Sequence, residues 1–239
     1  MKKIKPYNST ESKRSQIESM FDDISKRYDN LNQILTFGLH KKWRQRAIDL
    51  IDNNPEKILD IATGTADFAI AAKKLNPKSI IGIDISEKMI EIGNKKLKRK
   101  NLNNFIRLKI ADSQNLPFED NYFDAITIGF GVRNFEEIEK SISEAYRVLK
   151  KDGILLIMEP STKNNKFLSF LSKFYFEVIV TNIGYLFSKN SSAYNYLSES
   201  VKAFIDGETF LKILDEAKFK NCKHLKFSFG IIDLYWAKK

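Results

Sequence analysis

The chain has 239 residues, of which 43% are hydrophobic, and this is enough apolar material for one globular domain with an added segment. Its single cysteine, Cys222, and its two histidines, His40 and His224, exclude a disulfide framework and leave too few ligands for a zinc site, so we expect no metal. Residues 1–16 are polar and charged and lack the apolar stretch of a secretory signal, so we expect a protein of the reducing cytoplasm.

The formal net charge of +10 comes mostly from lysine and admits two interpretations. It indicates either attraction to a polyanion or a lysine-rich surface without a specific partner. The lysines are scattered along the chain, which favours the second interpretation, and we therefore expect no nucleic acid partner. A weak attraction to anionic lipid stays open.

The N-terminal part is predicted to be helical. Residues 1–16 are expected to form a mobile arm and residues 17–55 a helical cap. Apolar side chains at helical spacing indicate the first helix: Ile17, Met20, Phe21, Ile24 and Tyr28. Residues 28–43 mix asparagine, glycine and aromatic residues, which predicts a turn followed by short helical pieces. A further helix at 43–51 is closed by two asparagines and a proline.

Strands and helices alternate from residue 56 to the end of the chain. The predicted strands are 58–61, 79–85, 105–111, 123–130, 154–160, 224–229 and 231–236. The helices between them include 67–75, one capped by Ser86, one with Ile138, Ile142, Ala145 and Leu149 on one face, and 208–217 capped by Asp206. This alternation predicts an α/β fold with a doubly wound, mostly parallel sheet.

An apolar segment at about 163–200 interrupts the alternation. Lys173, Glu177, Asn182 and several serines prevent an uninterrupted span of the length that a bilayer requires, so it is not predicted to cross a membrane. Three interpretations remain: a helix packed on the core, a homodimer interface, or an apolar lid over a substrate site.

Three acidic residues stand where predicted strands end. Asp60, Asp84 and Asp112 close the first three strands, and a doubly wound sheet would bring them to one edge. An acid after the second strand can accept hydrogen bonds from ribose hydroxyls, and one after the third can reach the amine of adenine. Each acid alone could be a loop cap. Together they favour an adenosine-containing cofactor.

The turn after the first strand, residues 62–66, differs from a dinucleotide-binding turn. The sequence ATGTAD has one glycine and an added acid, which suits a phosphate poorly. A cationic tail fits better, and S-adenosyl-L-methionine, with its sulfonium and ammonium groups, matches this requirement.

Several motifs together resemble a known family. ILDIATGTAD, GIDIS and RVLKKDGILLIMEP are similar to the class I S-adenosylmethionine-dependent methyltransferases. FDDISKRYDNLNQILTFGLHKKWR, GFGVRNF and YNYLSES resemble, more specifically, the ubiquinone/menaquinone biosynthesis C-methyltransferases. The resemblance runs from about Phe21 to the C-terminal lysines. It implies a seven-stranded sheet with an antiparallel last strand, N-terminal helices and a helical insertion.

Six residues are predicted to bind the cofactor: Asp60, Thr65, Asp84, Asp112, Ser113 and Gly129. The prediction for Asp60 comes from its place at a strand end, and the resemblance implies the other five. Thr65 would lie in the turn that holds the methionine end. Ala62 and Ala66 stand where the family more often has glycine, and Ile205 where it usually has proline.

The same resemblance assigns catalytic roles to Arg133, Asn134 and Tyr28, facing the acceptor. Each has an alternative. Asn134 and Glu137 have the spacing of a capping box, and Tyr28 suits core packing. Arg133 has no acidic partner nearby in the sequence, which favours function. Glu159 is expected to orient substrate or cap a strand, and His40 to be structural.

The implied reaction is methyl transfer to a ring carbon of a polyprenylated hydroquinone. Demethylmenaquinol is the expected acceptor, with 2-methoxy-6-polyprenyl-1,4-benzoquinol as the alternative. A prenylated substrate implies a peripheral position at the inner face of the membrane. A methyltransferase for RNA or protein is the main rival, but the Asn/Asp-Pro-Pro-aromatic motif of amide and adenine methylation is missing after the fourth strand.

Overall fold

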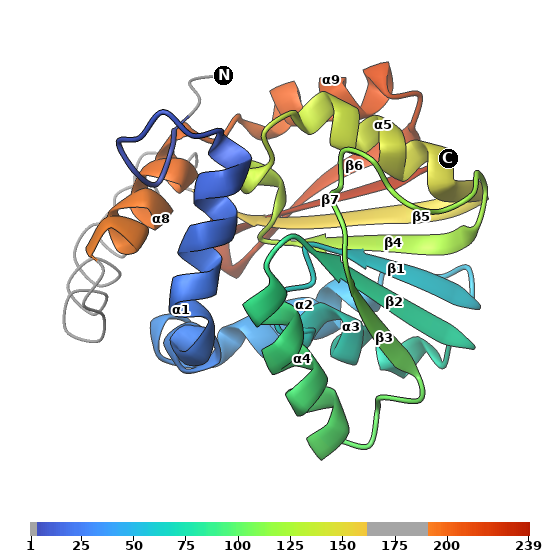
Figure 1. Ribbon diagram of the computed structural model, residues 1–239. Coiled ribbons are helices and arrows are strands. Elements are labelled where there is room, and N and C mark those ends of the chain that lie inside the picture. Colours follow the sequence, from blue (N-terminus) through green and yellow to red (C-terminus); the bar gives the residue numbers. More distant parts are fainter. Residues whose placement is uncertain (1–3, 162–190) are drawn as a thin grey trace.

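The computed structural model describes residues 4–161 and 191–239 (Figure 1). The helices are α1 (Lys13–Leu35), α2 (Leu39–Ile48), α3 (Asp67–Ala72), α4 (Glu87–Arg99), α5 (Ile138–Val148), α8 (Ser191–Ala203) and α9 (Gly207–Glu216). Short 3-10 helices are η1 (Lys73–Leu75), η2 (Val132–Asn134) and η4 (Ser228–Gly230). The strands are β1 (Lys57–Ile61), β2 (Ser79–Asp84), β3 (Ile106–Ile110), β4 (Phe123–Gly129), β5 (Leu149–Pro160), β6 (Lys220–Phe227) and β7 (Ile232–Lys238).

The strands form one seven-stranded sheet in the order β3-β2-β1-β4-β5-β7-β6. β7 runs antiparallel to both its neighbours, while the pairs among β1 to β5 are parallel. The predicted doubly wound sheet with an antiparallel last strand is confirmed. The strand order reverses between β1 and β4. In sheets of this kind, ligands bind at the carboxyl ends of the strands on either side of this reversal.

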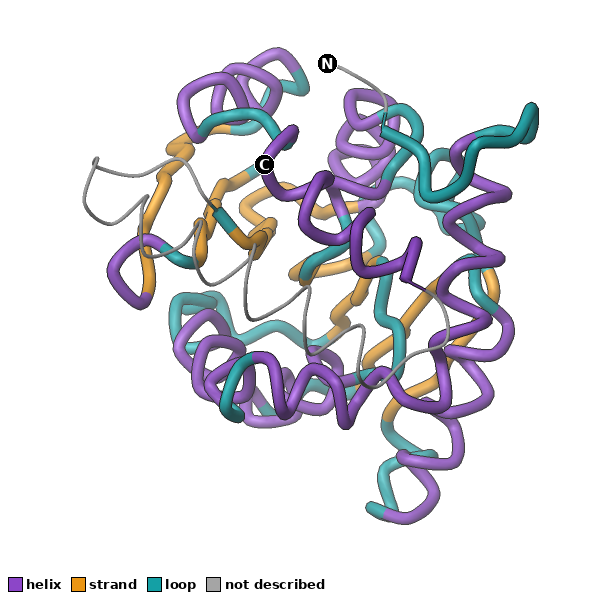
Figure 2. The backbone as a smooth tube through the Cα atoms, turned by 90° about the vertical axis from the view of Figure 1, so that its left-hand side faces the viewer, coloured by secondary structure: helices purple, strands orange, loops and turns teal. Residues whose placement is uncertain are grey.

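Each face of the sheet has its own apolar core, with helices on both sides (Figures 1 and 2). Alternate residues of β5 point to opposite faces: Leu155 and Ile157 join the core beneath α5 and α9, whereas Ile154 and Leu156 join the core beneath α2 and α3. This double burial explains the nearly continuous apolar runs of the central strands.

Two predicted helix caps are confirmed. The Ser86 hydroxyl accepts a hydrogen bond from the Met89 N–H at the start of α4. The Asp206 carboxylate accepts from the Thr209 N–H at the start of α9. These caps fix where the two helices begin.

Helix α1 begins earlier than the sequence predicts. It starts at Lys13, inside the stretch 1–16 that the sequence assigns to an arm, and Ser12 caps it. The Lys13 ammonium is buried and donates to the carbonyl oxygens of Arg133 (2.9 Å) and Phe135 (2.8 Å). A tertiary contact of this kind between distant segments has no signature in local periodicity.

Helix α1 also ends later than predicted. The turn predicted at the start of residues 28–43 is wrong, because the helix continues to Leu35. Leu31 and Leu35 are buried and extend the apolar face by two turns. The chain reverses at Gly38, whose φ of 74° is one that glycine adopts without strain.

Strand β5 begins at Leu149, which the sequence places on the preceding helix. In the structure Leu149 pairs with Phe123 of β4, and its side chain lies in the core beneath α5. An apolar residue at this junction satisfies both the helical and the strand pattern, so periodicity alone does not decide between them.

The apolar segment at about 163–200 is predicted to be a lid, a packed helix or a dimer interface. Its part up to residue 190 lies outside the described residues. These three interpretations stay predictions. Within the described ranges, no helix is long and apolar enough to span a bilayer. Helix α8, which begins at residue 191, lies near α1 at the same end of the sheet (Figures 1 and 2).

Candidate functional site

A cavity opens to solvent at the carboxyl edge of the sheet. Four of the six predicted cofactor residues line it: Asp84, Asp112, Ser113 and Gly129. Helix α1 closes it with side chains that the sequence analysis did not assign to a site: Arg14, Ile17 and Phe21. The first cavity is therefore made jointly by the sheet edge and the N-terminal helix.

Asp84 presents a partly buried carboxylate to the first cavity. Its Oδ2 accepts from the Gly64 N–H at 2.8 Å, and its Oδ1 accepts from the Ser86 N–H at 2.9 Å. Burial raises the pKa of Asp84, opposed by these backbone hydrogen bonds. Each oxygen keeps further acceptor capacity, so the geometry suits a ligand with neighbouring hydroxyl groups.

The turn after β1 is tight, and both its alanines have left-handed backbone conformations. Ala62 has φ 54° and Ala66 φ 71°, with Gly64 at φ 53° between them. Such angles favour glycine, so each alanine carries backbone strain at its position in the turn. The neighbourhood leaves little room: a Cβ on Gly131 would lie 2.6 Å from the Ala62 Cβ.

Asp60 does not reach the first cavity, although it ends a strand at the predicted edge. It is fully buried and accepts hydrogen bonds from the hydroxyls of Thr63 (2.5 Å) and Thr127 (2.7 Å) and from the Ala69 N–H (3.1 Å). Burial raises its pKa to about 6. Asp60 thus connects the turn, β4 and α3 through hydrogen bonds in the protein interior.

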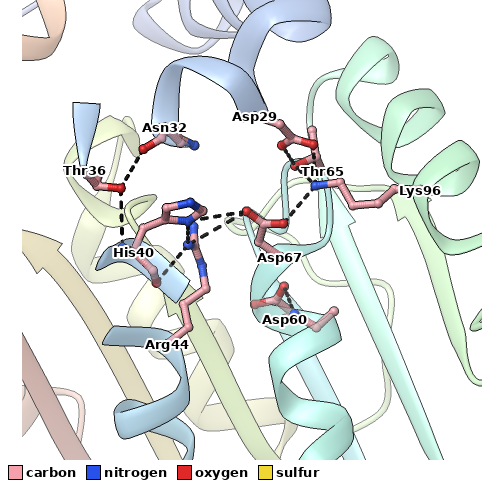
Figure 3. Close-up of polar contacts among 10 residues, drawn as sticks. Asp29, Asn32, Thr36, His40, Arg44, Asp60, Thr65, Asp67 and Lys96 are labelled. Atoms are coloured by element: carbon pink, nitrogen blue, oxygen red, sulfur yellow. Dashed lines mark hydrogen bonds and ion pairs between the residues drawn. The ribbon is translucent and has the colours of Figure 1, made fainter. Parts of the chain in front are cut away.

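Thr65 is likewise turned away from the first cavity and joins α1 to the turn (Figure 3). Its hydroxyl donates to Asp29 Oδ1 at 2.6 Å and accepts from Lys96 Nζ at 2.8 Å. Lys96 also contacts Asp29 Oδ2 at 2.6 Å and Asp67 Oδ1 at 2.8 Å. One ammonium therefore ties α1, the turn, α3 and α4 to one another.

Asp112 and Ser113 follow β3 at the wall of the first cavity. Asp112 Oδ2 lies 3.1 Å from Arg14 Nε, and its Oδ1 accepts from the Gln114 N–H at 2.9 Å. The Ser113 and Ser141 hydroxyls are 2.9 Å apart and buried. Among the described residues that line the first cavity, Arg14 is the one lysine or arginine, and its pairing with Asp112 leaves the wall without a free cation for a pyrophosphate.

A second cavity lies beside the first and shares part of its lining. The described part of its lining is mainly apolar and comes from α1, α2, α8 and the chain around η4 and β7: Met20, Ile24, Leu31, Leu35, Trp43, Leu197, Ile231 and Ile232. Four residues line both cavities: Phe21, Tyr28, Phe130 and Asn134. Burial raises the pKa of Tyr28, so its hydroxyl stays protonated at this boundary.

Arg133 lines the second cavity. It has an acidic partner, although none stands near it in the sequence. Its Nη1 donates to Glu159 Oε2 at 2.8 Å and to the Phe130 carbonyl at 2.6 Å. Glu159 has no exposed surface, and its burial raises its pKa, opposed by the charge of Arg133. The two residues are 26 positions apart and meet because β4 and β5 are adjacent parallel strands.

Asn134 is not a helix cap. Helix α5 begins after Glu137, which makes no side-chain cap, while Asn134 ends η2 and is buried. Its amide accepts from the Tyr196 hydroxyl at 3.0 Å and donates to the Phe130 carbonyl at 3.3 Å. The predicted capping box is wrong, and the amide instead connects η2 to α8 at the boundary of the two cavities.

His40 lies in the second cavity wall, next to Arg44 (Figure 3). Arg44 Nη1 is 2.6 Å from His40 Nδ1 and 3.9 Å from Asp67 Oδ2. Burial, assisted by the charge of Arg44, lowers the pKa of His40 to about 4. The imidazole is therefore neutral at pH 7.

Comparison with known proteins gives a consistent result. A profile of the ubiE/COQ5 methyltransferase family matches residues 9–239. The chain is 42% identical to the demethylmenaquinone methyltransferase of Bacteroides fragilis, over 99% of this chain and 98% of that protein. It is 40% identical to the ubiquinone/menaquinone biosynthesis C-methyltransferase UbiE of Geotalea daltonii, over 95% and 97% respectively.

A solved structure from Methanococcus maripaludis, classed as an S-adenosyl-L-methionine-dependent methyltransferase, superposes with a TM-score of 0.69 at 23% identity. The match covers 98% of this chain and 96% of that one, and it shows the shared fold. The first cavity fits this cofactor class, since it offers the Asp84 carboxylate and no free cation among its described residues. The chain therefore belongs to the ubiE/COQ5 methyltransferase family, and it is a methyltransferase that uses S-adenosyl-L-methionine.

Proposed function

We propose that this enzyme methylates a ring carbon of a polyprenylated hydroquinone, with demethylmenaquinol as its acceptor. The observation that carries the proposal is the junction of two cavities of different chemistry, one with carboxylates at the sheet edge and one mainly apolar. An aromatic ring in the apolar cavity could meet a methyl donor at this junction. An apolar cavity does not suit RNA or a charged protein segment, which disfavours the main rival.

The first cavity would hold the cofactor through Asp84, Asp112 with Ser113, and the backbone around Gly129. S-adenosyl-L-methionine supplies an electrophilic methyl group when bound. Gly129 is needed there because a Cβ at this position would lie 2.4 Å from the Phe68 ring. Asp60 and Thr65 act indirectly, by fixing the turn that borders the cavity.

The acceptor must become a better nucleophile in the second cavity. A ring carbon beside a hydroxyl attacks well only after that hydroxyl gives its proton to water and charge spreads into the ring. Once the ring carbon has taken the methyl group, it loses its own hydrogen as a proton and the hydroxyl is restored, so one proton in all passes to water. Arg133, buried and oriented by Glu159, would stabilise the developing phenolate. Tyr28 and Asn134, which line both cavities, would orient the ring toward the methyl group.

The names of the relatives support a polyprenylated quinol as the acceptor. They are compatible with two such acceptors, a naphthoquinol and a benzoquinol. The Bacteroides fragilis relative is named for demethylmenaquinone, whereas the Geotalea daltonii relative is named for both ubiquinone and menaquinone biosynthesis. The higher identity and coverage of the first favour the naphthoquinol, and 2-methoxy-6-polyprenyl-1,4-benzoquinol is the second candidate.

A prenylated acceptor requires access from a lipid bilayer, and exposed apolar side chains near the second cavity suit peripheral attachment. Phe37 is 75% exposed in the turn between α1 and α2, directly after Thr36 of the second cavity, and Phe229 is 83% exposed beside Ile231 of the same cavity. Leu39 is also exposed, and Lys41 and Lys42 follow it. Aromatic tips next to lysines favour the surface of an anionic membrane.

Mass spectrometry of the quinone pool in cells that lack this protein tests the function. Accumulated demethylmenaquinone, reversed when the intact gene is returned, is the expected result. Accumulation of the methoxybenzoquinol precursor would instead select the second candidate. An unchanged quinone pool would contradict both.

Sedimentation with anionic phospholipid vesicles tests the membrane attachment. The double variant Phe37→Ser with Phe229→Ser should sediment less with the vesicles than the wild-type protein, and equal sedimentation would contradict the role of these side chains.

A further inference from the structure

His40 is one of the few polar residues that line the second cavity, and it is buried. His40 is the second residue of α2, and it is only 3% exposed. Its backbone N–H is 3.4 Å from the Thr36 hydroxyl, which fixes the start of α2 against the end of α1. The imidazole lies in a wall whose other side chains are mainly apolar.

The tautomer of His40 follows from its neighbour. A guanidinium has donors and no acceptor, so Arg44 Nη1, 2.6 Å away, must donate to His40 Nδ1. Arg44 is held by a second hydrogen bond to the His40 carbonyl at 3.2 Å and by the charge of Asp67 (Figure 3). Because Nδ1 accepts, the neutral imidazole carries its proton on Nε2.

The Nε2–H is buried and, among the described residues, has no hydrogen-bond partner. A buried donor without a partner is unfavourable, and such groups in folded proteins are expected to have a reason. The lining of the second cavity offers one: its apolar side chains suit the hydrocarbon part of a ligand, and a neutral N–H among them can donate to an oxygen atom of that ligand.

We propose that His40 is an acceptor-binding residue, whose Nε2–H donates a hydrogen bond to a ring oxygen of the substrate in the second cavity. The inference rests on the proposed function and deepens it, because it assigns a polar contact that fixes how the quinol ring lies. A neutral donor strengthens its hydrogen bond as negative charge develops on that oxygen. Arg44 is then a positioning residue, which acts by holding the imidazole in the donating tautomer.

Steady-state kinetics with a demethylnaphthoquinol that carries a single isoprenyl unit tests the contact. His40→Leu should lower kcat/KM for this acceptor by about tenfold to hundredfold, the usual effect of removing one buried hydrogen bond to a substrate. The Kd of S-adenosyl-L-methionine, measured by calorimetry, should change by less than about twofold. His40→Gln should recover most of the loss, because its amide can accept from Arg44 and donate into the cavity at the same time.

His224→Gln is the matched control, since it removes the other histidine of the chain, which lies outside both cavities and 2.9 Å from Asp233. It should leave the kinetics unchanged. Unchanged kinetics in His40→Leu, or an equal loss of cofactor affinity, would overturn the assignment while the proposed function stands. If the wild-type protein methylates no quinol, the proposed function itself fails.

Nitrogen NMR of the histidine side chains gives a second readout that a purely structural role would not move. The wild-type His40 should show the Nε2-protonated neutral form, and its Nε2 signal should shift when the short-tail naphthoquinol is added. A Nδ1-protonated form, or a Nε2 signal unaffected at saturating quinol, would overturn the proposal.

Discussion

Replacing Arg133 alone should disturb folding as well as catalysis, because Glu159, its partner in the ion pair, is fully buried. Arg133→Met leaves that carboxyl without a cation, and breaking a buried pair in this way typically costs about 3–5 kcal/mol of the free energy of unfolding. The double variant, Arg133→Met with Glu159→Gln, removes both charges. It should regain most of the lost stability, since replacing a whole buried pair is often close to neutral.

The penalty in the Arg133→Met protein should depend on pH. Burial already raises the pKa of Glu159, and loss of the guanidinium raises it further. Below about pH 4.3, the ordinary pKa of glutamate, the carboxyl is protonated in the folded and the unfolded chain, and the penalty vanishes. Above that pH the unfolded chain ionises more readily than the folded one, so the single variant loses stability as the pH rises.

Both variants should lose turnover by about a hundredfold or more, because the developing phenolate loses its stabilising cation. Cofactor affinity should change by less than about threefold, since Arg133 lines the second cavity and is not among the described residues that line the first. Urea unfolding, calorimetry and single-turnover methylation measure the three quantities. A double variant with wild-type turnover, or one with a large loss of cofactor affinity, would refute the reasoning.

Three further substitutions test other parts of the account. Asp84→Asn should weaken S-adenosyl-L-methionine binding by about tenfold or more in calorimetry, and unchanged affinity would contradict the ribose assignment. Ala62→Gly should raise the free energy of unfolding in urea by about 0.5–1 kcal/mol. Left-handed backbone costs alanine about 1–2 kcal/mol, which glycine avoids, but the greater entropy of glycine in the unfolded chain offsets part of this gain. A lower free energy of unfolding would count against strain at Ala62. Lys96→Met should lower the free energy of unfolding by about 1–2 kcal/mol, since two partly exposed carboxylates lose their shared cation. Lys95→Met on the exposed face of the same helix is the control, and equal effects of the two substitutions would contradict the linking role.

The sheet could be predicted from the sequence because its signals are local. Short apolar runs alternate with capped helices, and caps such as Ser86 and Asp206 confirm where α4 and α9 begin. The edge at which Asp84 and Asp112 meet follows from parallel strand direction alone. Local pattern was therefore sufficient for the number and chain order of the strands, and for which strand ends face the cofactor cavity. It placed the starts of β5 and β6 too late, because they begin at Leu149 and Lys220 and not at residues 154 and 224.

The parts that the sequence missed depend on contacts between distant segments. The Arg133 to Glu159 pair requires knowledge that β4 and β5 are neighbours. Lys13 is buried only because Arg133 of η2 and Phe135 directly after η2 offer it their carbonyl oxygens. For Asp60 the local pattern is misleading, since this strand-end acid is predicted to bind the cofactor but faces the protein interior.

His40 illustrates what pattern reasoning cannot reach. One histidine at the start of a helix is most simply interpreted as structural. Only the placement of Arg44 at Nδ1, the orphaned Nε2 and the apolar wall give it a role at the acceptor site.

The most direct test of the central claim is methylation by the purified protein of a short-tail demethylnaphthoquinol, with S-adenosyl-L-methionine labelled by deuterium on its methyl group. Mass spectrometry and NMR then locate the label. The account predicts one deuterated methyl group on the quinol ring carbon, and none when the cofactor is withheld. Label on a ring oxygen, or no labelled product with either the naphthoquinol or the benzoquinol, would contradict it.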